Sequence, residues 1–479
     1  MRKRVNENET AKAESETKTV VNNVITEINK QYNTIKITTL DRAHSCILQR
    51  FFSGSFCVDH IVGGGFAYRR MQLLFGGRSS GKNALLYQTI AYNQRLCKNC
   101  GGVLPEFGEM EVKDRWTDVL MNICAIPLCN CGNSEGRIAC FFDYERSLST
   151  EAQTTRNIHT YIDKATGEKI DELDYNDKCV EYETLTSSND YEISGDTDLI
   201  DAKAKKARIK ELEKYFEGIE VSSVVVPSLP TKDYVKECGV LIDRLLVADP
   251  EFTEEGIDMV IPIIKSRGAD IIVWDSLQAA IPLRVYEKDA DQATMGIEAR
   301  QNGLLMRKVC SAFAAGNLED PKEAFKPAFF IISQVRANLG MFVSGPDTFS
   351  GGKAVEHHIA LALELKREHF LKASGERAEF KDTAFGQKVR LRAEKNKLNN
   401  PSSMYEFDYY FCPNEFRPIG IDHRSELVYL AIRENIIERV GSYYIYNDMK
   451  FHGMNKVLEY MNENYPKSYA DVYKKLFHR

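Results

Sequence analysis

The chain has 479 residues, of which 43% are hydrophobic and 28% charged, a composition typical of globular proteins that excludes collagen-like and wholly disordered chains. At roughly 100–200 residues per domain, this length predicts two to four domains. The net charge of −6 argues neither for nor against a nucleic-acid partner. The first twenty residues lack the apolar stretch of a secretory signal, and no window approaches the ~18 apolar residues of a membrane helix. We therefore expect a cytoplasmic protein with no membrane partner.

The charge is unevenly distributed. Residues 151–230 carry 18 acidic and 10 basic side chains, whereas the rest of the chain has 53 basic and 51 acidic ones. This contrast predicts an acidic insert in a near-neutral body. The 12 cysteines do not suggest a disulfide scaffold in a chain this long, and in a reducing compartment clustered cysteines more often bind metal.

Periodicity predicts an α/β fold. Residues 1–18 are polar and aperiodic and are expected to form a disordered arm, and residues 20–32 show the spacing of an amphipathic helix. Buried strands are predicted at 72–76, 138–143, 245–249, 270–275 and 328–333, alternating with helices at 84–96, 254–267 and 295–315. Apolar strands alternating with helices indicate a mostly parallel, twisted sheet with helices on both faces. Beyond residue 420 the pattern predicts a small, mostly helical terminal domain.

A phosphate-binding motif follows the first of these strands. It fits the P-loop pattern GxxxxGK and comprises Gly76, Gly77, Arg78, Ser79, Ser80, Gly81, Lys82 and Asn83. Backbone N–H groups of such a loop surround phosphate oxygens, and Lys82 would reach the β- and γ-phosphates of ATP. The motif has Ser or Thr, a Mg²⁺ ligand, where Asn83 stands. Asp275 ends an apolar strand as a second Mg²⁺ residue would. The alternative interpretation is a glycine-rich turn used for packing and an aspartate that caps a strand.

Further motifs are distributed along the chain. They are NVITEINKQYN (23–33), the strand and loop of 53–82, FFDYE (141–145), GVLIDRLLVADPEFTEEG with ADIIVWDS, SQVRANLGMFVSGPDTFSGGKA (333–354), AEKNKLNNP (393–401) and SELVYLAIRENIIERVGSYYIYND (425–448). These segments resemble those of bacterial and phage RecA recombinases, and the resemblance extends from the N-terminal helix to near the C-terminus. It implies a RecA-like P-loop NTPase core at 53–420. A polymerisation helix and linker at 19–52 would precede the core, and a small α/β domain at 421–479 would follow it.

The resemblance also implies roles for individual residues. Glu145 would activate the attacking water, and Gln334 would sense the γ-phosphate. Lys395 and Lys397 would reach the ATP of a neighbouring subunit, and Tyr234 would stack on the adenine. Without the surrounding motifs, the two lysines would be interpreted as a solvated charge pair.

DNA would be bound by two loops, at about 283–296 and 335–352. The residues assigned to this role are Met295, Gly296, Arg300, Arg307, Arg336, Leu339, Gly351 and Gly352. Arg300 and Arg307 are seven residues apart and share a helical face, which suits phosphate contacts but is also common on ordinary surfaces. Binding is expected to be independent of base sequence.

Two insertions depart from the family pattern. Residues 97–136 contain Cys97, Cys100, Cys129 and Cys131, which predict a structural Zn²⁺ site, with Cys124 as an alternate ligand and unrelated buried thiols as the competing interpretation. The acidic insertion at 150–229 leaves from the nucleotide edge of the sheet and contains one exposed helix at 201–220; its function cannot be predicted.

The leading hypothesis is therefore an ATP-dependent DNA recombinase, a DNA-dependent ATPase requiring ATP and Mg²⁺. It would form helical filaments of itself on single-stranded DNA and exchange strands with duplex DNA in recombination and repair. The alternatives are a RecA-fold ATPase of helicase or regulatory type and a DNA-binding filament protein with weak ATPase activity, the latter because of Asn83.

Overall fold

The structure is a computed structural model. It describes residues 22–108, 114–132, 134–148, 155–167, 169–170, 196–227, 232–288, 296–336, 348–349, 352–379, 384–399, 404–413 and 418–477, with short pieces between 175 and 186. The disordered segment expected at 1–18 lies outside these residues. None of the helices in the described part is both long and apolar enough to span a membrane.

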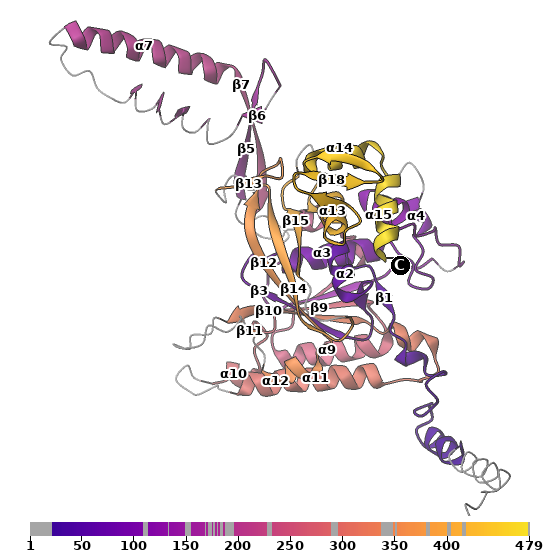
Figure 1. Ribbon diagram of the computed structural model, residues 1–479. Helices are drawn as coiled ribbons and strands as arrows, with labels where there is room; N and C mark the ends of the chain where they lie inside the picture. Colours follow the sequence, from indigo (N-terminus) through magenta and orange to yellow (C-terminus); the bar gives the residue numbers. More distant parts are fainter. Residues whose placement is uncertain are drawn as a thin grey trace, which may run out of the picture.

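A large, mostly parallel sheet forms the centre of the molecule (Figure 1). Its strand order is β16-β15-β14-β12-β3-β10-β9-β4-β8. The mutually parallel strands are β12 (Leu361–Leu371), β3 (Met71–Gly76), β10 (Ala328–Arg336), β9 (Ile271–Asp275), β4 (Ala139–Asp143) and β8 (Leu245–Ala248). The antiparallel extension comprises β14 (Gly386–Asn396), β15 (Met404–Tyr410) and β16 (Gly420–Ile421), and the short strands β11 (Thr348–Phe349) and β13 (Arg377–Ala378) pair with β10 and β12.

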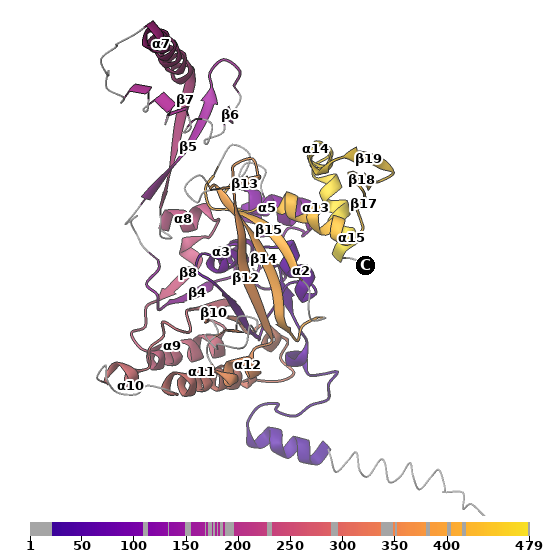
Figure 2. The same cartoon turned by 60° about the vertical axis from the view of Figure 1, so that its left-hand side comes forward.

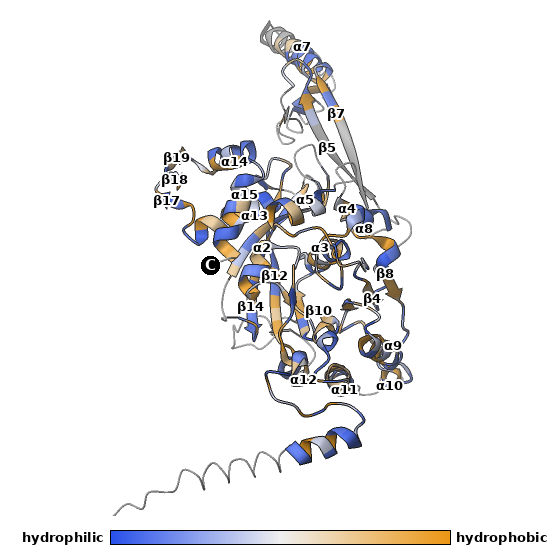
Figure 3. Ribbon diagram, turned by 90° about the vertical axis from the view of Figure 1, so that its right-hand side faces the viewer, coloured by the Kyte–Doolittle hydropathy of each residue, from blue (hydrophilic) through white to orange (hydrophobic). Residues whose placement is uncertain are grey.

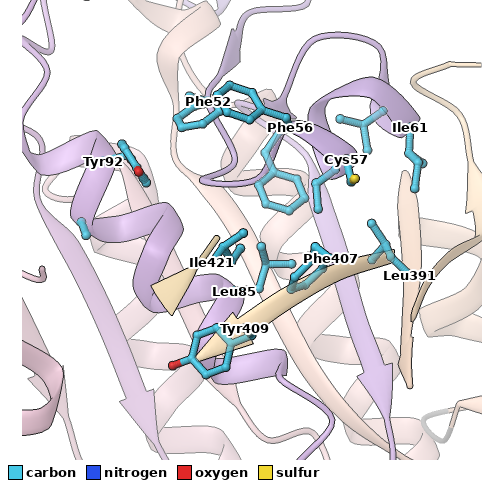
Figure 4. Close-up of a cluster of buried hydrophobic side chains, with 14 of the residues drawn as sticks. Phe52, Phe56, Cys57, Ile61, Leu85, Tyr92, Leu391, Phe407, Tyr409 and Ile421 are labelled. Atoms are coloured by element: carbon cyan, nitrogen blue, oxygen red, sulfur yellow. The ribbon is translucent and has the colours of Figure 1, made fainter. Parts of the chain in front are cut away.

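Helices cover both faces of this sheet, as predicted. One face packs on α9 (Thr253–Ser266), α11 (Ile297–Ala314) and α12 (Lys353–His358), and the other on α2 (Phe56–Val62) and α3 (Lys82–Gln94) (Figure 2). Strand β3 shows why its residues are continuously apolar, because Leu73 and Phe75 enter one core while Leu74 enters the other. Figure 3 shows hydrophobic residues along the central strands, and Figure 4 shows Phe56, Leu85 and Tyr409 joining α2, α3 and β15 in one buried cluster.

All five predicted strands and the three predicted helices are present, but one expectation was wrong. The segment at 245–249 was expected to be a buried strand, whereas β8 is the last strand of the sheet. Its Leu246 and Val247 side chains are 48% and 55% exposed. An apolar run has the same sequence pattern in an edge strand and in a central one, so the pattern cannot distinguish the two.

The C-terminal region is a small mixed domain. Its elements are α13 (His423–Arg433), β17 (Glu438–Val440), β18 (Tyr443–Tyr446), β19 (Met449–His452), α14 (Met454–Glu463) and α15 (Lys467–Phe477). The three strands form an antiparallel sheet, so the α/β expectation taken from the resemblance describes it better than the mostly helical one. Glu426 of α13 ties it to the core, because its buried carboxylate accepts hydrogen bonds from the Ser55 hydroxyl and the Cys57 backbone N–H.

The insertions attach at opposite edges of the sheet. The first leaves from the C-terminal end of α3 and contains α4 (Pro105–Gly108), α5 (Arg115–Asp118) and a π-helical turn, η2 (Val119–Ile123). The second follows β4 and comprises β5 (Thr155–Asp163), β6 (Lys169–Ile170), α7 (Asp196–Glu217) and β7 (Ile219–Pro227), which project away from the body as an arm (Figure 1). Helix α7 contains most of the exposed helix predicted at 201–220, whereas the strands of the arm were not predicted.

Shorter elements complete the described chain. The predicted N-terminal helix covers 22–31, and the backbone N–H of Leu318 donates to the Ile35 carbonyl beyond it (3.0 Å). The remaining elements are η1 (His44–Cys46), β1 (Arg50–Phe51), β2 (Phe66–Ala67), α8 (Lys232–Glu237), η3 (Ile242–Arg244), α10 (Leu283–Tyr286) and η4 (Pro321–Phe325).

Candidate functional site

The candidate site lies where four adjacent parallel strands end. Gln334 at the end of β10 is in register with Gly76 at the end of β3, and Asp143 of β4 is in register with Asp275 of β9. Because the strands run in parallel, their carboxyl ends meet at one edge of the sheet, where ligands of open α/β sheets bind.

The loop of 76–83 joins β3 to the first turn of α3. The Lys82 ammonium group folds back into the loop and donates to the carbonyls of Gly76 (3.0 Å) and Gly77 (2.7 Å). Gly81 precedes the helix with φ +97°, a conformation that L side chains rarely adopt. Burial lowers the pKa of Lys82, and the charges of Asp275 and Glu145 oppose that shift. A partly desolvated ammonium at a helix N-terminus is suited to bind a polyphosphate.

Asn83 is directly bonded to Asp275. The Asn83 side-chain amide donates to the Asp275 carboxylate (Nδ2–Oδ2 2.9 Å). Burial raises the pKa of Asp275 to about 7, with a further increase from the charge of Glu145, while the bond from Asn83 acts in the opposite direction. A cation beside this carboxylate would favour its ionised form. Asp275 and the amide oxygen of Asn83 thus have the donor chemistry that Mg²⁺ prefers.

Glu145 lies near Asp275. Its carboxylate accepts a hydrogen bond from the Ser276 hydroxyl and one from the side-chain amide of Gln334 (3.3 Å). The Glu145 side chain is exposed, so a water molecule can approach it from solvent. The structure therefore brings together Lys82, Asn83, Asp275, Glu145 and Gln334 from segments spread over 250 residues.

Two contributors were missed by the sequence analysis. Ser276 holds Glu145, and Gln278 fixes Gln334 by accepting from its backbone N–H (3.2 Å) and donating to its carbonyl (3.1 Å). Their only sequence signal is their position one and three residues after Asp275, because polar residues that follow a strand at this edge point toward the ligand.

Tyr234 lies on α8, at the base of the arm. Its hydroxyl is 2.9 Å from the Tyr409 hydroxyl of β15, and burial raises the pKa of Tyr234. The structure thus fixes the orientation of Tyr234, and adenine stacking by this residue stays a prediction.

Lys395 and Lys397 lie at the opposite edge of the sheet from Gly76. Lys395 pairs in register with Ala362, which pairs with Leu73 near the start of β3, and the backbone N–H of Lys397 donates to Ala360 (2.8 Å). The Lys395 ammonium donates to the Glu356 carbonyl, and Lys397 to that of His357 (3.4 Å). The two lysines are therefore far from the phosphate loop of their own chain.

The two predicted DNA loops end side by side. Met295, Leu339 and Gly351 lie outside the described residues, and only the backbone of Arg336 is described, paired with Thr348. Gly296 begins α11 and Gly352 begins α12, and a Cβ built at Gly352 would lie 3.4 Å from the Cβ of Ala299, one turn into α11.

Both arginines predicted to contact DNA lie on α11. The side chains of Arg300 and Arg307 are exposed on this helix. The α11 surface is thus available for phosphate contacts beside both loop ends.

The four predicted zinc ligands form one cluster. The sulfur atoms of Cys97, Cys100, Cys129 and Cys131 all lie within 4.8 Å of one another. Tetrahedral Zn²⁺ with Zn–S bonds of ~2.3 Å requires sulfur atoms about 3.8 Å apart, so this geometry fits the ion. A hydrogen bond with Ser134 lowers the pKa of Cys129 to about 6, which favours the thiolate that binds metal.

Cys124, the alternate ligand, is not part of this cluster. It lies in the main core, where burial raises the pKa of its thiol. The structure therefore favours the four-residue set that excludes it.

Comparison with known proteins identifies similarity over part of the chain. Residues 224–414 match the family model for the RecA N-terminal domain. The chain is 30% identical over 232 residues to Protein RecA of Leptospira biflexa (48% of this chain, 54% of that protein). It is 30% identical over 240 residues to Protein RecA of Tropheryma whipplei (50% and 49%) and 28% identical over 232 residues to that of Legionella pneumophila (48% and 60%). The chain thus spans about half the length of the curated relatives it matches.

The family-model match contains Asp275, Gln334 and the two lysines but neither the phosphate loop nor Glu145. The structure joins the matched and unmatched parts, because Asn83 bonds to Asp275 and Gln334 bonds to Glu145.

Proposed function

We propose that this chain is a RecA-type recombinase, a DNA-dependent ATPase that forms filaments on single-stranded DNA and pairs it with homologous duplex DNA. The observation that carries the proposal is the convergence of the phosphate loop, Glu145, Asp275 and Gln334 at one edge of the sheet. The similarity of residues 224–414 to the RecA N-terminal domain supports it independently.

Each residue of the site has a separate role in ATP hydrolysis. The loop and Lys82 bind the phosphates, while Glu145 takes a proton from the attacking water. Mg²⁺ held by Asp275 and Asn83 would neutralise phosphoryl charge. Ser276 and Gln334 would hold the Glu145 carboxylate in place through their hydrogen bonds.

Gln334 supplies the coupling to DNA. It contacts Glu145 and lies three residues before segment 337–347, the main part of the second predicted DNA loop. The other end of this loop begins α12, whose carbonyls accept from Lys395 and Lys397. If these lysines bind the ATP of a neighbouring subunit, each DNA loop is linked to two nucleotide sites. One end is linked through Gln334 to the site of its own chain, and the other through α12 to the site of the neighbouring subunit.

The proposal is tested by ATP turnover with and without single-stranded DNA, together with joint-molecule formation between a single strand and a homologous duplex. Glu145→Gln should retain ATP binding and filament formation but lose most turnover, about 100-fold or more, because the proton acceptor is removed. Glu459→Gln, on the exposed surface of α14, serves as the control. Near-normal turnover of Glu145→Gln would remove Glu145 from the mechanism, and absence of joint molecules with the unaltered chain would overturn the recombinase proposal.

The lysine pair should act between subunits. Lys395→Ala combined with Lys397→Ala should reduce DNA-stimulated turnover about tenfold or more while leaving ATP binding by the isolated subunit unchanged, because neither lysine reaches its own phosphate loop. Lys474→Ala with Lys475→Ala on α15 removes two exposed charges as a control. An equal loss of ATP binding by the isolated subunit would contradict the intersubunit role.

Compared with the Ser or Thr of the motif, Asn83 should weaken Mg²⁺ binding without abolishing it. The side-chain oxygen of asparagine lies further from the backbone than the hydroxyl oxygen of threonine. In addition, the Asn83 amide N–H is bonded to Asp275. Asn83→Thr should therefore shift the Mg²⁺ dependence of turnover to lower concentration without changing DNA affinity at saturating Mg²⁺. Identical Mg²⁺ titrations would make Asn83 a neutral replacement, and no turnover by either protein at any Mg²⁺ concentration would favour a filament protein without catalysis.

The cysteine cluster should hold about one Zn²⁺ per chain. Elemental analysis of the purified protein measures the metal, and Cys100→Ser should lose it because a tetrahedral site needs all four ligands. Cys46→Ser removes an exposed thiol outside the cluster and should retain the metal. A metal-free chain with four reactive native thiols would contradict the zinc site.

A further inference from the structure

Trp116 of the first insertion contacts the rest of the chain at Arg95 and Gly239. The guanidinium carbons of Arg95 and Arg115 lie 4.6 and 4.1 Å from the centre of its ring, within the range of cation–π attraction. Arg115 also donates to the carbonyls of Glu237 (3.2 Å) and Ile419. The insertion therefore packs against both the end of α8 and the start of the C-terminal domain.

The backbone of Gly239 lies directly against the Trp116 ring. Its φ is +92°, and a Cβ added at this position would overlap the indole. Arg95 donates to the Gly239 carbonyl (2.7 Å), so the same two side chains hold Gly239 by ring contact and by hydrogen bond. Gly239 can be neither rotated nor replaced without moving Trp116.

Gly239 lies two residues beyond the end of α8, the helix of Tyr234. Its N–H donates to the Lys236 carbonyl (2.8 Å), and the neighbouring Val240 N–H donates to Val235 (3.3 Å). These bonds transmit any displacement of Gly239 to the α8 backbone one turn away. The position of α8 thus depends on Arg95 and Trp116.

Arg95 in turn is held by the first insertion (97–136), which with its four-cysteine cluster forms a cysteine module. The Arg95 carbonyl accepts from the Leu104 N–H (2.9 Å), and Leu104 packs in one buried cluster with Cys97 and Cys129. Its guanidinium donates to Asp114 (2.6 Å) and lies 5.4 Å from the centre of the Phe107 ring, both within the insertion. A continuous set of contacts therefore joins the four cysteines to α8.

We propose that the cysteine module is a positioning element for the nucleotide-binding segment: its metal fixes Arg95 and Trp116, which hold Gly239 and thereby α8 with Tyr234 in the geometry that binds the ATP base. The inference rests on the proposed function and adds a role for the insertion. Arg95 and Trp116 are positioning residues that do not touch the nucleotide.

The test is ATP binding and turnover by the full chain with Trp116→Ala. We expect the Kd for a fluorescent ATP analogue and the KM for ATP to rise about three- to tenfold, with kcat changed less than about twofold, because the phosphate loop and Glu145 are untouched. Gly239→Ala should give the same KM effect. Gly441→Ala adds a methyl group at φ +64° with no atom within 4 Å of it, and controls for backbone strain alone. Trp116→Phe keeps an aromatic ring and should retain most of the ATP affinity that Trp116→Ala loses.

A second measurement does not depend on activity. The chain has two tryptophans, so Trp274→Phe leaves Trp116 as the single tryptophan whose emission is followed. Removing the metal with a chelator should shift its emission and speed amide hydrogen exchange at 232–241. Unchanged exchange at 232–241 after complete metal loss, or unchanged ATP affinity in folded Trp116→Ala, would overturn the inference while leaving the proposed function intact. An unaltered chain that binds no ATP would overturn both.

Discussion

The parallel register of β3, β10, β9 and β4 is the constraint on which the candidate site depends. Because Gln334 is level with Gly76 and Asp143 is level with Asp275, residues from four segments reach the same point with no further backbone rearrangement. A one-residue shift of any of these strands would turn its side chains to the opposite face of the sheet, and a shift of β3 or β9 would separate Asn83 from Asp275. The register is fixed by the apolar residues that fill both faces, so the hydrophobic core determines the geometry of a polar site.

Electrostatics complement this geometry. The site places a buried carboxylate and a buried ammonium close together, and burial shifts the pKa of Asp275 upward to about 7 and that of Lys82 downward. Both shifts show that each charged form is under-solvated. A nucleotide with a divalent cation would supply a negative charge to Lys82 and a positive charge to Asp275, so its binding would relieve both desolvation penalties at once.

The sequence predicted five of the six mutually parallel strands, because each of these five is a continuous apolar run. It did not predict β12 and β14, whose charged residues alternate with buried ones, as in LALELKREHFL, and which no turn motif marks. The phosphate loop, Glu145, Asp275 and the four cysteines were identifiable from local motifs. Ser276 and Gln278 were not, because their roles depend on contacts with residues 131 and 56 positions away.

The two insertions differ in how far the core depends on them. The arm is connected through the ends of β5 and β7 and forms its own sheet, with aromatic contacts such as Tyr161 on Tyr175. The first insertion instead completes the environment of Arg95, a core residue that is only 3% exposed. A buried guanidinium is tolerated only when its donors and charge are matched, and here Asp114 and Trp116, both from the insertion, provide the carboxylate and the aromatic ring. Removing the insertion would take away both the carboxylate and the ring that match this guanidinium, so this segment is part of the core, whereas the arm is an appendage.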